Sequence, residues 1–148
     1  MPFMYDIATL SLICYYVKNY PIRYIHTKRI LMKVKYDGKE YACSFAFALD
    51  MISGKWKGLI LWYLRNETLR YGEIRKKLDG ITQKMLTQTL RDLEKHQLIT
   101  RKVYPVVPPK VEYTITSHGK RLIPIFEQML EWGNEVGAEL GEVSEYDK

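Results

Sequence analysis

The stretch that decides the fold runs from residue 80 to residue 116 and reads GITQKMLTQTLRDLEKHQLITRKVYPVVPPKVEYTIT. Its first half repeats apolar residues with the period of an α-helix, and Thr82 has the residue type of an N-cap, so a helix is predicted from there to about His96. Its second half is rich in β-favouring residues on both sides of Pro105–Pro109, a segment that cannot pair as a strand. The sequence therefore predicts a helix followed by a β-hairpin with strands over 98–104 and 110–115.

Three shorter helices are predicted before this stretch, over residues 45–52, 55–65 and 73–78. The second is apolar on most sides, which is typical of a helix buried at the centre of a small domain. Only Asp79-Gly80-Ile81 separates the third from the helix that begins after Thr82, and Asp-Gly supplies turn chemistry there. This order of elements indicates a winged helix-turn-helix: three helices, a short turn, a fourth helix and then a hairpin.

A long amphipathic helix is predicted after the hairpin, with Thr116 as its cap, Ser117 as its first residue and its end near Gly137. Its apolar stripe, which we expect to form a homodimer interface, includes Leu122, Ile125, Phe126, Met129, Leu130 and Trp132. A flank of acids at i,i+4 spacing, expected to be solvated, consists of Glu127, Glu131, Glu135 and Glu139. The expected fold class is mainly α with a small β-hairpin: a winged helix-turn-helix with an additional C-terminal dimerisation helix.

The helix before the hairpin divides sharply by face. Its three leucines at 86, 90 and 93 share one side at about 100° per residue. The opposite side has no acid and consists of Lys84, Thr87, Gln88, Arg91 and Lys95. A face that only meets solvent usually mixes signs, because acid–base pairs four residues apart stabilise a helix. Cations interleaved with Gln and Thr suit phosphates and base edges, so we expect this face to contact double-stranded DNA.

The charge distribution agrees with a polyanionic partner. The 148 residues carry a net charge of +6, but residues 1–110 carry +11 and residues 111–148 carry −5. The +4 on residues 81–110 lies on the candidate DNA-contacting helix and hairpin, while the acids belong to the last strand, the last helix and the tail.

Other classes of protein are disfavoured. Two cysteines are too few for a disulfide framework, and three scattered histidines offer no zinc-binding spacing, so we expect a reducing compartment and no metal or other cofactor. The longest apolar run, Ile7–Val17, is too short to span a bilayer and lacks the flanks of a signal peptide. No acid pair, catalytic triad or Cys/His pair supports an enzyme. We expect a cytoplasmic protein that is not an enzyme and not bound to a membrane.

Three segments resemble the HxlR-type winged-helix transcriptional regulators, a MarR-like family. They are residues 50–57 (DMISGKWK), residues 80–94 and the hairpin from Val103 to Thr116, in matching order and spacing. The resemblance covers about residues 41–136 and implies a small prokaryotic homodimer that binds operator DNA and represses or activates nearby genes. A two-fold dimer doubles the small contact of one winged helix and reads an inverted repeat with half-sites about one helical turn apart.

The resemblance also implies site residues. Those expected to face the major groove are Thr82, Gln83, Lys84, Thr87, Gln88 and Arg91. Those expected at the wing and the DNA backbone are Lys55, Arg101, Lys102 and Lys110. An alternative for Lys55 is a helix-start residue with a packing role. Trp56 and Tyr113 are expected in the core.

A cysteine just ahead of the first domain helix is frequent in the family, and Cys43 stands there. In several members that thiol senses electrophiles or disulfide stress, and positive dipole ends at a helix N-terminus favour a reactive thiolate. The alternative is a small buried apolar residue, as free cysteines usually are. The family's usual proline after this cysteine is replaced by Ser44, which loosens the inferred geometry.

The domain organisation that we expect is an N-terminal extension over residues 1–40, a winged-helix domain over 41–137 and an acidic tail over 138–148. Met32 opens a more ordinary beginning than Met1, so it is a candidate for the native start. The alternative function is a winged-helix module for protein–protein docking without operator binding, which would not need so many cations on one helix and its hairpin.

Overall fold

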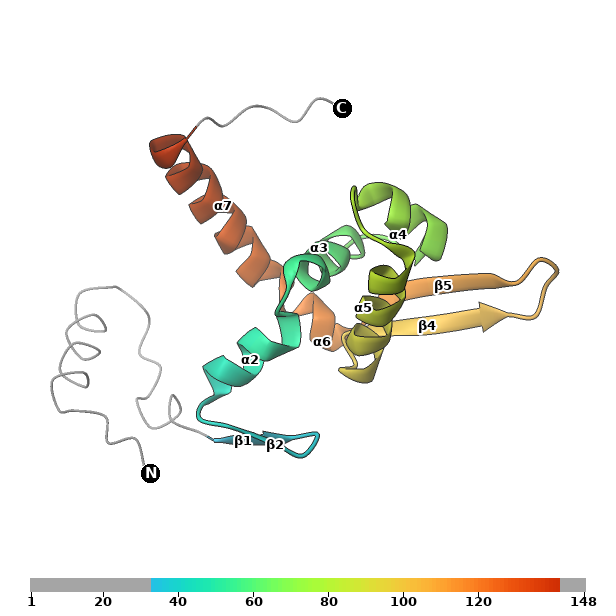
Figure 1. Ribbon diagram of the computed structural model, residues 1–148, viewed down its shortest axis with the longest axis horizontal. Coiled ribbons are helices and arrows are strands. Elements are labelled where there is room, and N and C mark those ends of the chain that lie inside the picture. Colours follow the sequence, from blue (N-terminus) through green and yellow to red (C-terminus); the bar gives the residue numbers. More distant parts are fainter. Residues whose placement is uncertain (1–32, 142–148) are drawn as a thin grey trace, which may run out of the picture. The chain divides into compact units, whose positions relative to one another are not determined.

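The structure is a computed structural model that describes residues 33–141. Its elements are β1 (Val34–Tyr36), β2 (Lys39–Tyr41), α2 (Ser44–Ile52), α3 (Lys55–Tyr63), β3 (Leu69–Arg70), α4 (Tyr71–Lys77), α5 (Gln83–Lys95), β4 (Ile99–Tyr104), β5 (Lys110–Ile115), α6 (Ser117–Lys120) and α7 (Ile123–Leu140), all labelled or traceable in Figure 1. The chain forms two compact units, Met1–Ala48 and Leu49–Lys148. The expectations for residues 1–31, for Met32 and for the tail beyond residue 141 lie outside the described residues.

The described part of the first unit contains a β-hairpin that we did not expect from the sequence. Asp37 and Gly38 both have positive φ, at 51° and 75°, which is the backbone of a two-residue turn between antiparallel strands. The rings of Tyr36 and Tyr41 share one face of this hairpin, and each packs edge-on against Phe47 with centroids 5.5 and 5.3 Å apart. Residues 34–40, assigned above to the N-terminal extension, therefore form an ordered hairpin together with Tyr41.

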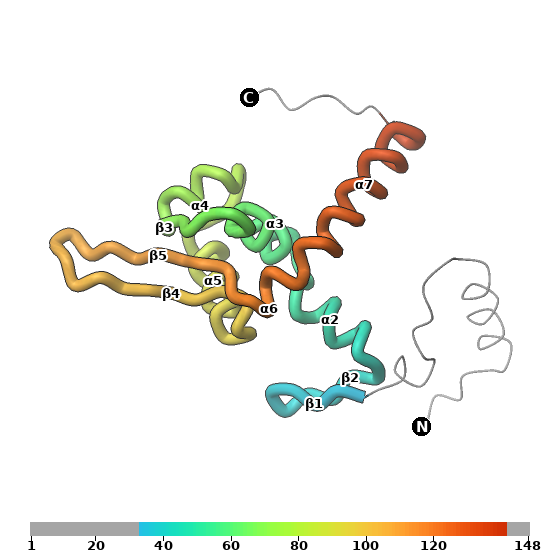
Figure 2. The backbone as a smooth tube through the Cα atoms, turned by 180° about the vertical axis from the view of Figure 1, so that it is seen from behind, coloured from blue at the N-terminus to red at the C-terminus, as the bar shows by residue number. Residues whose placement is uncertain are grey.

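The second unit is a winged helix, as expected. Helices α3, α4 and α5 pack around one apolar core, and the sheet with strand order β3-β5-β4 closes one side of it (Figures 1 and 2). The side chains that are essentially excluded from water are Ile60, Leu61, Leu64, Ile74, Leu86, Leu90, Leu93 and Ile99. Each contributes about 1.5–3 kcal/mol relative to an exposed side chain, so this core fixes the position of α5.

Two boundaries before the hairpin differ by two residues from the expected ones. Helix α3 ends at Tyr63 rather than Arg65, and α4 begins at Tyr71 rather than residue 73. The earlier start has a physical cause: the Glu73 carboxylate accepts a 2.6 Å hydrogen bond from the Arg70 backbone N–H and so closes the first turn of α4. The two residues before it form β3, a third strand that pairs with β5.

The long C-terminal helix was expected to be continuous from Ser117, and this is wrong. Thr116 caps the four-residue helix α6, its hydroxyl oxygen accepting from the Gly119 N–H at 3.1 Å, and a separate helix α7 follows. Pro124 explains the break, because proline has no N–H and its ring clashes with the carbonyl four residues earlier. At the first turn of α7 the same proline is favourable.

The buried glycine of α6 supports a stability prediction. A Cβ at Gly119 would meet the Leu98 carbonyl oxygen and would lie 2.6 Å from Cγ1 of Ile115. Gly119→Ala should therefore lower the free energy of unfolding by about 1–3 kcal/mol, the usual cost of overpacking. Urea denaturation followed by circular dichroism measures this change.

The matched control is Gly72→Ala in α4, where a Cβ meets nothing within 4 Å. That substitution should leave stability unchanged or raise it by about 0.5–1 kcal/mol, because alanine loses less backbone entropy than glycine. Equal midpoints for the two variants would contradict the close packing of α6 on the sheet.

Candidate nucleic-acid interface

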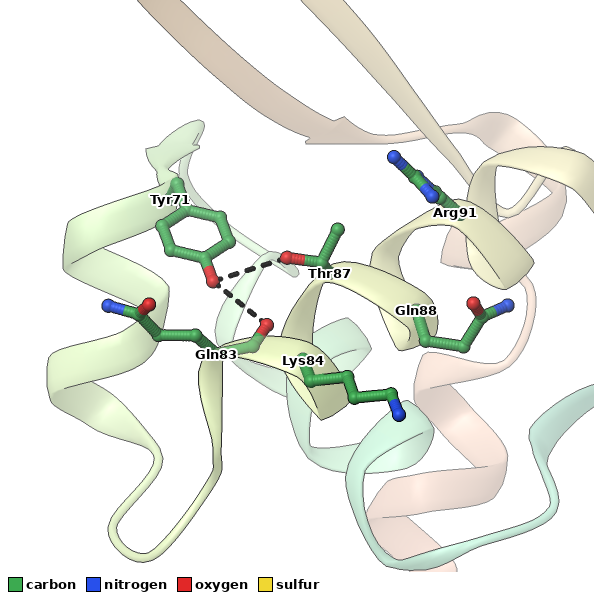
Figure 3. Close-up of a pocket in the computed structure, with 6 residues that line it drawn as sticks. All are labelled: Tyr71, Gln83, Lys84, Thr87, Gln88 and Arg91. Carbon is green, nitrogen blue, oxygen red and sulfur yellow. Dashed lines mark hydrogen bonds between the residues drawn. The ribbon is translucent and has the colours of Figure 1, made fainter.

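Helix α5 has the capped start and the divided faces that the sequence predicted. The Thr82 hydroxyl accepts from the Met85 N–H at 3.2 Å and caps the helix. The leucine side faces the core. A shallow hollow on the opposite side, shown in Figure 3 and called the recognition face below, is lined by Tyr71, Gln83, Lys84, Thr87, Gln88 and Arg91. Five of the six residues expected at the major groove therefore lie together, and the sixth, Thr82, is the cap.

Tyr71 is a residue of this face that sequence reasoning missed. It comes from the start of α4, and its hydroxyl lies 3.1 Å from the Gln83 carbonyl oxygen and 3.3 Å from the Thr87 hydroxyl (Figure 3). A tyrosine at a helix start has no periodic signal in the sequence, so only the tertiary packing of α4 on α5 brings it here.

The polar groups of the recognition face are partly committed to one another. The Gln88 side-chain amide donates to the Asp92 carboxylate at 2.9 Å. The expectation that no acid reaches this face is therefore wrong at this point, because one helical turn brings the two side chains together. The cationic ends of Lys84 and Arg91, unlike the Gln88 amide, are not bonded to a neighbouring side chain in this way. Both residues are exposed, and no ion pair holds either of them within residues 33–141.

The wing is the hairpin β4–β5, which extends beyond the helices (Figure 1). Lys102 opposes Glu112 and Arg101 opposes Tyr113. Because neighbouring residues of a strand alternate, Lys102 and Arg101 lie on opposite faces of the sheet. The wing residues expected to bind DNA therefore do not form one patch. Arg101 and Lys102 are both exposed, whereas Lys110 is half-buried.

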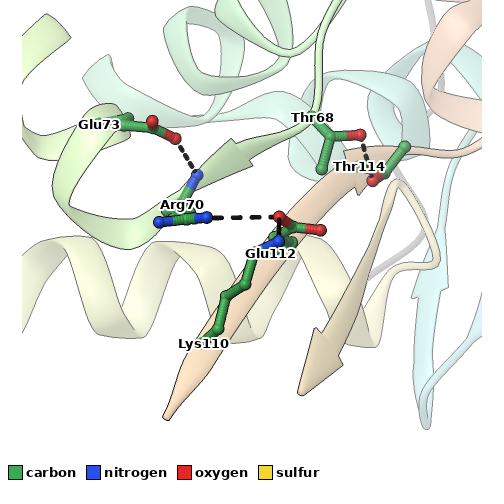
Figure 4. Close-up of polar contacts among 6 residues, drawn as sticks. All are labelled: Thr68, Arg70, Glu73, Lys110, Glu112 and Thr114. Atoms are coloured by element: carbon green, nitrogen blue, oxygen red, sulfur yellow. Dashed lines mark hydrogen bonds and ion pairs between the residues drawn. The ribbon is translucent and has the colours of Figure 1, made fainter. Parts of the chain in front are cut away.

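Lys110 is held by an acid of its own strand. Its ammonium pairs with the Glu112 carboxylate, which also lies 3.9 Å from the Arg70 guanidinium (Figure 4). The ammonium groups of Lys102 and Lys110 lie 4.9 and 4.7 Å from the centroid of the Tyr104 ring. We call these residues, Arg70, Lys102, Tyr104, Lys110 and Glu112, the Glu112 cluster.

The pKa of Glu112 is lowered from its usual value. The main causes are the hydrogen bonds that its carboxylate accepts from Lys110 and from Tyr104, with the charges of Lys110 and Arg70 acting in the same direction. Glu112 is therefore ionised at neutral pH and offsets part of the positive charge of the Glu112 cluster. The predicted strand over 110–115 already places Lys110 and Glu112 on the same face, but Lys110 was counted as a fully available cation.

The remaining single residues lie as follows. Lys55 is exposed at the start of α3 with its ammonium 4.4 Å from the centroid of the Trp56 ring. Tyr113 is buried and Trp56 packs against the core, as expected. Cys43 is a free, half-buried thiol, and its sulfur accepts from the Ala46 N–H at 3.5 Å in the first turn of α2.

The apolar stripe of the C-terminal helix divides into two sets. Phe126 is buried in the protomer's own core, and Leu122 packs against that core. Ile125, Met129, Leu130 and Trp132 are exposed by 52%, 57%, 51% and 66%. The beginning of α7 packs on α3, while the rest of the helix extends away from the sheet (Figure 2). These four residues therefore form an apolar surface that no part of residues 33–141 covers.

Two kinds of site are absent from the part of the chain that the structure describes. No three residues of the His, Cys, Asp and Glu types in that part come close enough to hold a metal ion. None of the described helices combines the length and the apolar character needed to cross a membrane.

The chain is similar to known transcriptional regulators. The sequence model of the family described as HxlR-like helix-turn-helix matches residues 51–140. An uncharacterised HTH-type transcriptional regulator of Methanothermobacter thermautotrophicus is 50% identical over 99 residues, which make up 67% of this chain and 76% of that protein. The uncharacterised HTH-type regulator YkvN of Bacillus subtilis is 47% identical over 95 residues, or 64% of this chain and 80% of YkvN. The structure of the redox regulator HypR in its oxidised form is 46% identical, with a TM-score of 0.60, over 63% of this chain and 96% of HypR.

Proposed function

This chain belongs to the HxlR-like helix-turn-helix family of transcriptional regulators, and we propose that it binds an inverted-repeat operator as a homodimer. Helix α5 reads the major groove of each half-site through the recognition face, and the wing lies on the neighbouring backbone or minor groove. The observation that carries this proposal is the recognition face itself, where exposed Lys84 and Arg91 flank Gln and Thr side chains on one side of a rigidly packed helix.

Dimerisation follows from two physical arguments. One winged helix buries too little surface on DNA for operator affinity, so a second copy is needed. The exposed apolar residues of α7 supply a surface for that copy, and an isologous contact between two such surfaces gives the two-fold symmetry that an inverted repeat requires.

The experiment that tests this proposal is selection from a library of random-sequence duplexes by the purified full-length protein, followed by fluorescence anisotropy with the selected duplex. We expect one enriched inverted repeat and tighter binding to it than to random duplex by at least about 1,000-fold. A protein that enriches no sequence would favour the alternative, a winged-helix docking module for another protein.

Glu112 provides a prediction about non-specific binding. Glu112→Gln removes the negative charge that holds Lys110 and Arg70, so random duplex should bind more tightly at low salt. The plot of log K against log salt concentration should steepen by about one unit per protomer, because about one more phosphate is neutralised. Anisotropy at several salt concentrations measures both quantities.

The control for this prediction is Glu131→Gln on α7, which removes the same charge from an exposed position away from the wing. It should leave the slope for random duplex unchanged. An equal steepening in both variants would mean that net charge, not the local pairing of Lys110, sets the effect.

We also propose that Cys43 responds to oxidants. The sulfur lies at the N-terminus of α2, where it accepts from the Ala46 N–H, and the similar protein HypR is named a redox regulator. Diamide takes two electrons and two protons from the Cys43 thiol and a second thiol, which is Cys14 or the Cys43 of another protomer, and leaves a disulfide between them. It should therefore change the operator affinity of the wild-type protein by about 5-fold to 150-fold, a typical coupling between two sites.

The matched variants are Cys43→Ser and Cys14→Ser. The first should bind the operator equally well with and without diamide, in the same anisotropy assay. A diamide response that survives in Cys43→Ser would contradict the role of Cys43, and a response lost only in Cys14→Ser would assign it to the other cysteine.

A further inference from the structure

We infer that hydrogen bonds inside the recognition face determine which bases it reads: Thr87 presents its methyl group to a thymine, and Gln88 pairs with an adenine. The inference rests on the proposed function, because it assumes that α5 lies in the major groove. It goes further by assigning A·T base pairs to two named side chains of each protomer. Three contacts carry it, namely Tyr71–Gln83, Tyr71–Thr87 and Gln88–Asp92.

The proton of the Thr87 hydroxyl is already used within the protein. The Gln83 carbonyl oxygen can only accept, so the single proton of the Tyr71 hydroxyl goes to it over 3.1 Å. The Tyr71 oxygen then accepts at 3.3 Å, and the only proton available for that bond is the one on the Thr87 hydroxyl. Thr87 therefore has no proton left for a base.

The hydroxyl oxygen can still accept a hydrogen bond, but it is turned toward Tyr71, so the group that Thr87 offers to DNA is its methyl. With the hydroxyl turned toward Tyr71, the methyl group points away from that ring (Figure 3). The apolar feature of the major groove is the C5-methyl group of thymine, and apolar contact with it is an established mode of base recognition. A cytosine at the same place lacks that methyl.

The orientation of the Gln88 amide is fixed by the chemistry of Asp92. An ionised carboxylate has no proton to donate, so the amide must turn its nitrogen, not its oxygen, toward Asp92, over 2.9 Å. One N–H is used in this bond, which leaves the second N–H and the carbonyl oxygen for the groove. These two groups complement the N7 acceptor and the N6 amino donor of adenine, whereas guanine presents two acceptors there.

The experiment uses the duplex that the protein selects from random sequence. Each thymine is replaced in turn by deoxyuridine, which removes only the methyl group, and each adenine by purine deoxyriboside, which removes only the N6 amino group. We expect one thymine in each half-site at which uracil weakens binding about threefold to fourfold, as for one buried methyl group. We expect one adenine in each half-site at which loss of the amino group weakens binding about tenfold or more.

The matching protein variants localise each effect. Thr87→Ser keeps the hydroxyl and removes the methyl, so its affinity should not depend on the uracil substitution. Gln88→Ala should lose the dependence on the adenine amino group while keeping the dependence on the thymine methyl. Tyr71→Phe removes the bond that orients the Thr87 hydroxyl, so the methyl is no longer held in place and the dependence of affinity on the thymine methyl should weaken. Circular dichroism melting of each variant checks that it folds.

Failure of the inference is distinguishable from failure of the proposed function. If the protein selects a sequence but no uracil or purine substitution affects its affinity, or if the effects persist in Thr87→Ser and Gln88→Ala, the base assignment is wrong and operator binding stands. If the protein selects no sequence, operator binding itself is wrong and the base assignment falls with it.

Discussion

Replacing Lys84 and Arg91 by alanine together should reduce operator affinity by at least about 100-fold. Each residue lies on the recognition face with its charged end free of ion pairs in the described part of the chain, so each is available to a phosphate or a guanine. A contact of this kind is worth about 1–3 kcal/mol, and both are lost in both half-sites of a dimer. The dependence of log K on log salt should also become shallower by about two units per protomer.

The control for this prediction is the pair Lys120→Ala and Arg121→Ala, which removes the same charge from α6 and its C-terminal cap. We expect the control to bind within about threefold of the wild-type protein, because neither residue lines the recognition face and exposed charges outside the contact are screened by salt. Equal losses in the two double variants would show that overall charge, not α5, drives binding. If Lys84→Ala/Arg91→Ala bound the operator as tightly as the wild-type protein, α5 would not be part of the DNA interface.

Trp132→Glu on α7 should convert the dimer into a monomer. Trp132 is the most exposed of the four apolar residues on the uncovered surface of α7, and a new carboxylate there would repel its copy across a two-fold axis. The protomer should still fold, since the side chain is 66% exposed and lies outside the core. Sedimentation velocity at micromolar concentration should give the monomer mass, and operator affinity should fall by at least about 100-fold because half of the contacts are lost.

Ala138→Glu is the matched control, since it adds the same charge to the same helix. Position 138 is exposed and lies about 120° around the helix from Trp132 and about 80° from Leu130, so its side chain lies on the side of Glu127 and Glu131. This variant should remain a dimer with the wild-type affinity. A dimeric Trp132→Glu protein would contradict the role of this surface, and the contact between protomers would then have to lie elsewhere.

The sequence predicted the part of the fold that depends on strong local signals. Thr82 and the leucine period defined α5, and the prolines between residues 105 and 109 defined the wing loop, because these residues restrict the backbone wherever they occur. The Asp37-Gly38 turn carries an equally strong signal, flanked by alternating tyrosines and charged residues. It was missed because the N-terminal region as a whole was treated as an extension.

Other features depend on tertiary contacts and had no comparable signal. Strand β3 has two residues, too few for any period, and forms because β5 offers it hydrogen-bonding groups. Pro124 did mark the break between α6 and α7, but the apolar residues on both sides fitted one continuous stripe. The prediction of one helix therefore followed the apolar period, although Pro124 marked the boundary between α6 and α7.

The candidate site shows the same division. Four residues of the recognition face were predicted from the helical period, namely Lys84, Thr87, Gln88 and Arg91, while Gln83 was predicted from the family resemblance and Tyr71 was missed. The roles proposed for Thr87 and Gln88 could not be predicted, because they depend on which of their protons are used by Tyr71 and Asp92. The wing is similar: Lys110 was predicted as a free cation, whereas the two-residue period of β5 places Glu112 on the same face, and the register of β3 on β5 adds Arg70.

The account depends most on the placement of α5 in the major groove, and a tethering experiment tests it directly. Gln83→Cys, in a protein with Cys14→Ser and Cys43→Ser, puts one thiol at the first residue of α5. Selected duplexes carry a thiol linker either on cytosine N4, which opens into the major groove, or on guanine N2, which opens into the minor groove. We predict a disulfide cross-link on non-reducing gels with the major-groove linker at one position of each half-site and none with the minor-groove linker. Cross-linking to the minor-groove linker alone, with operator affinity retained, would contradict the account.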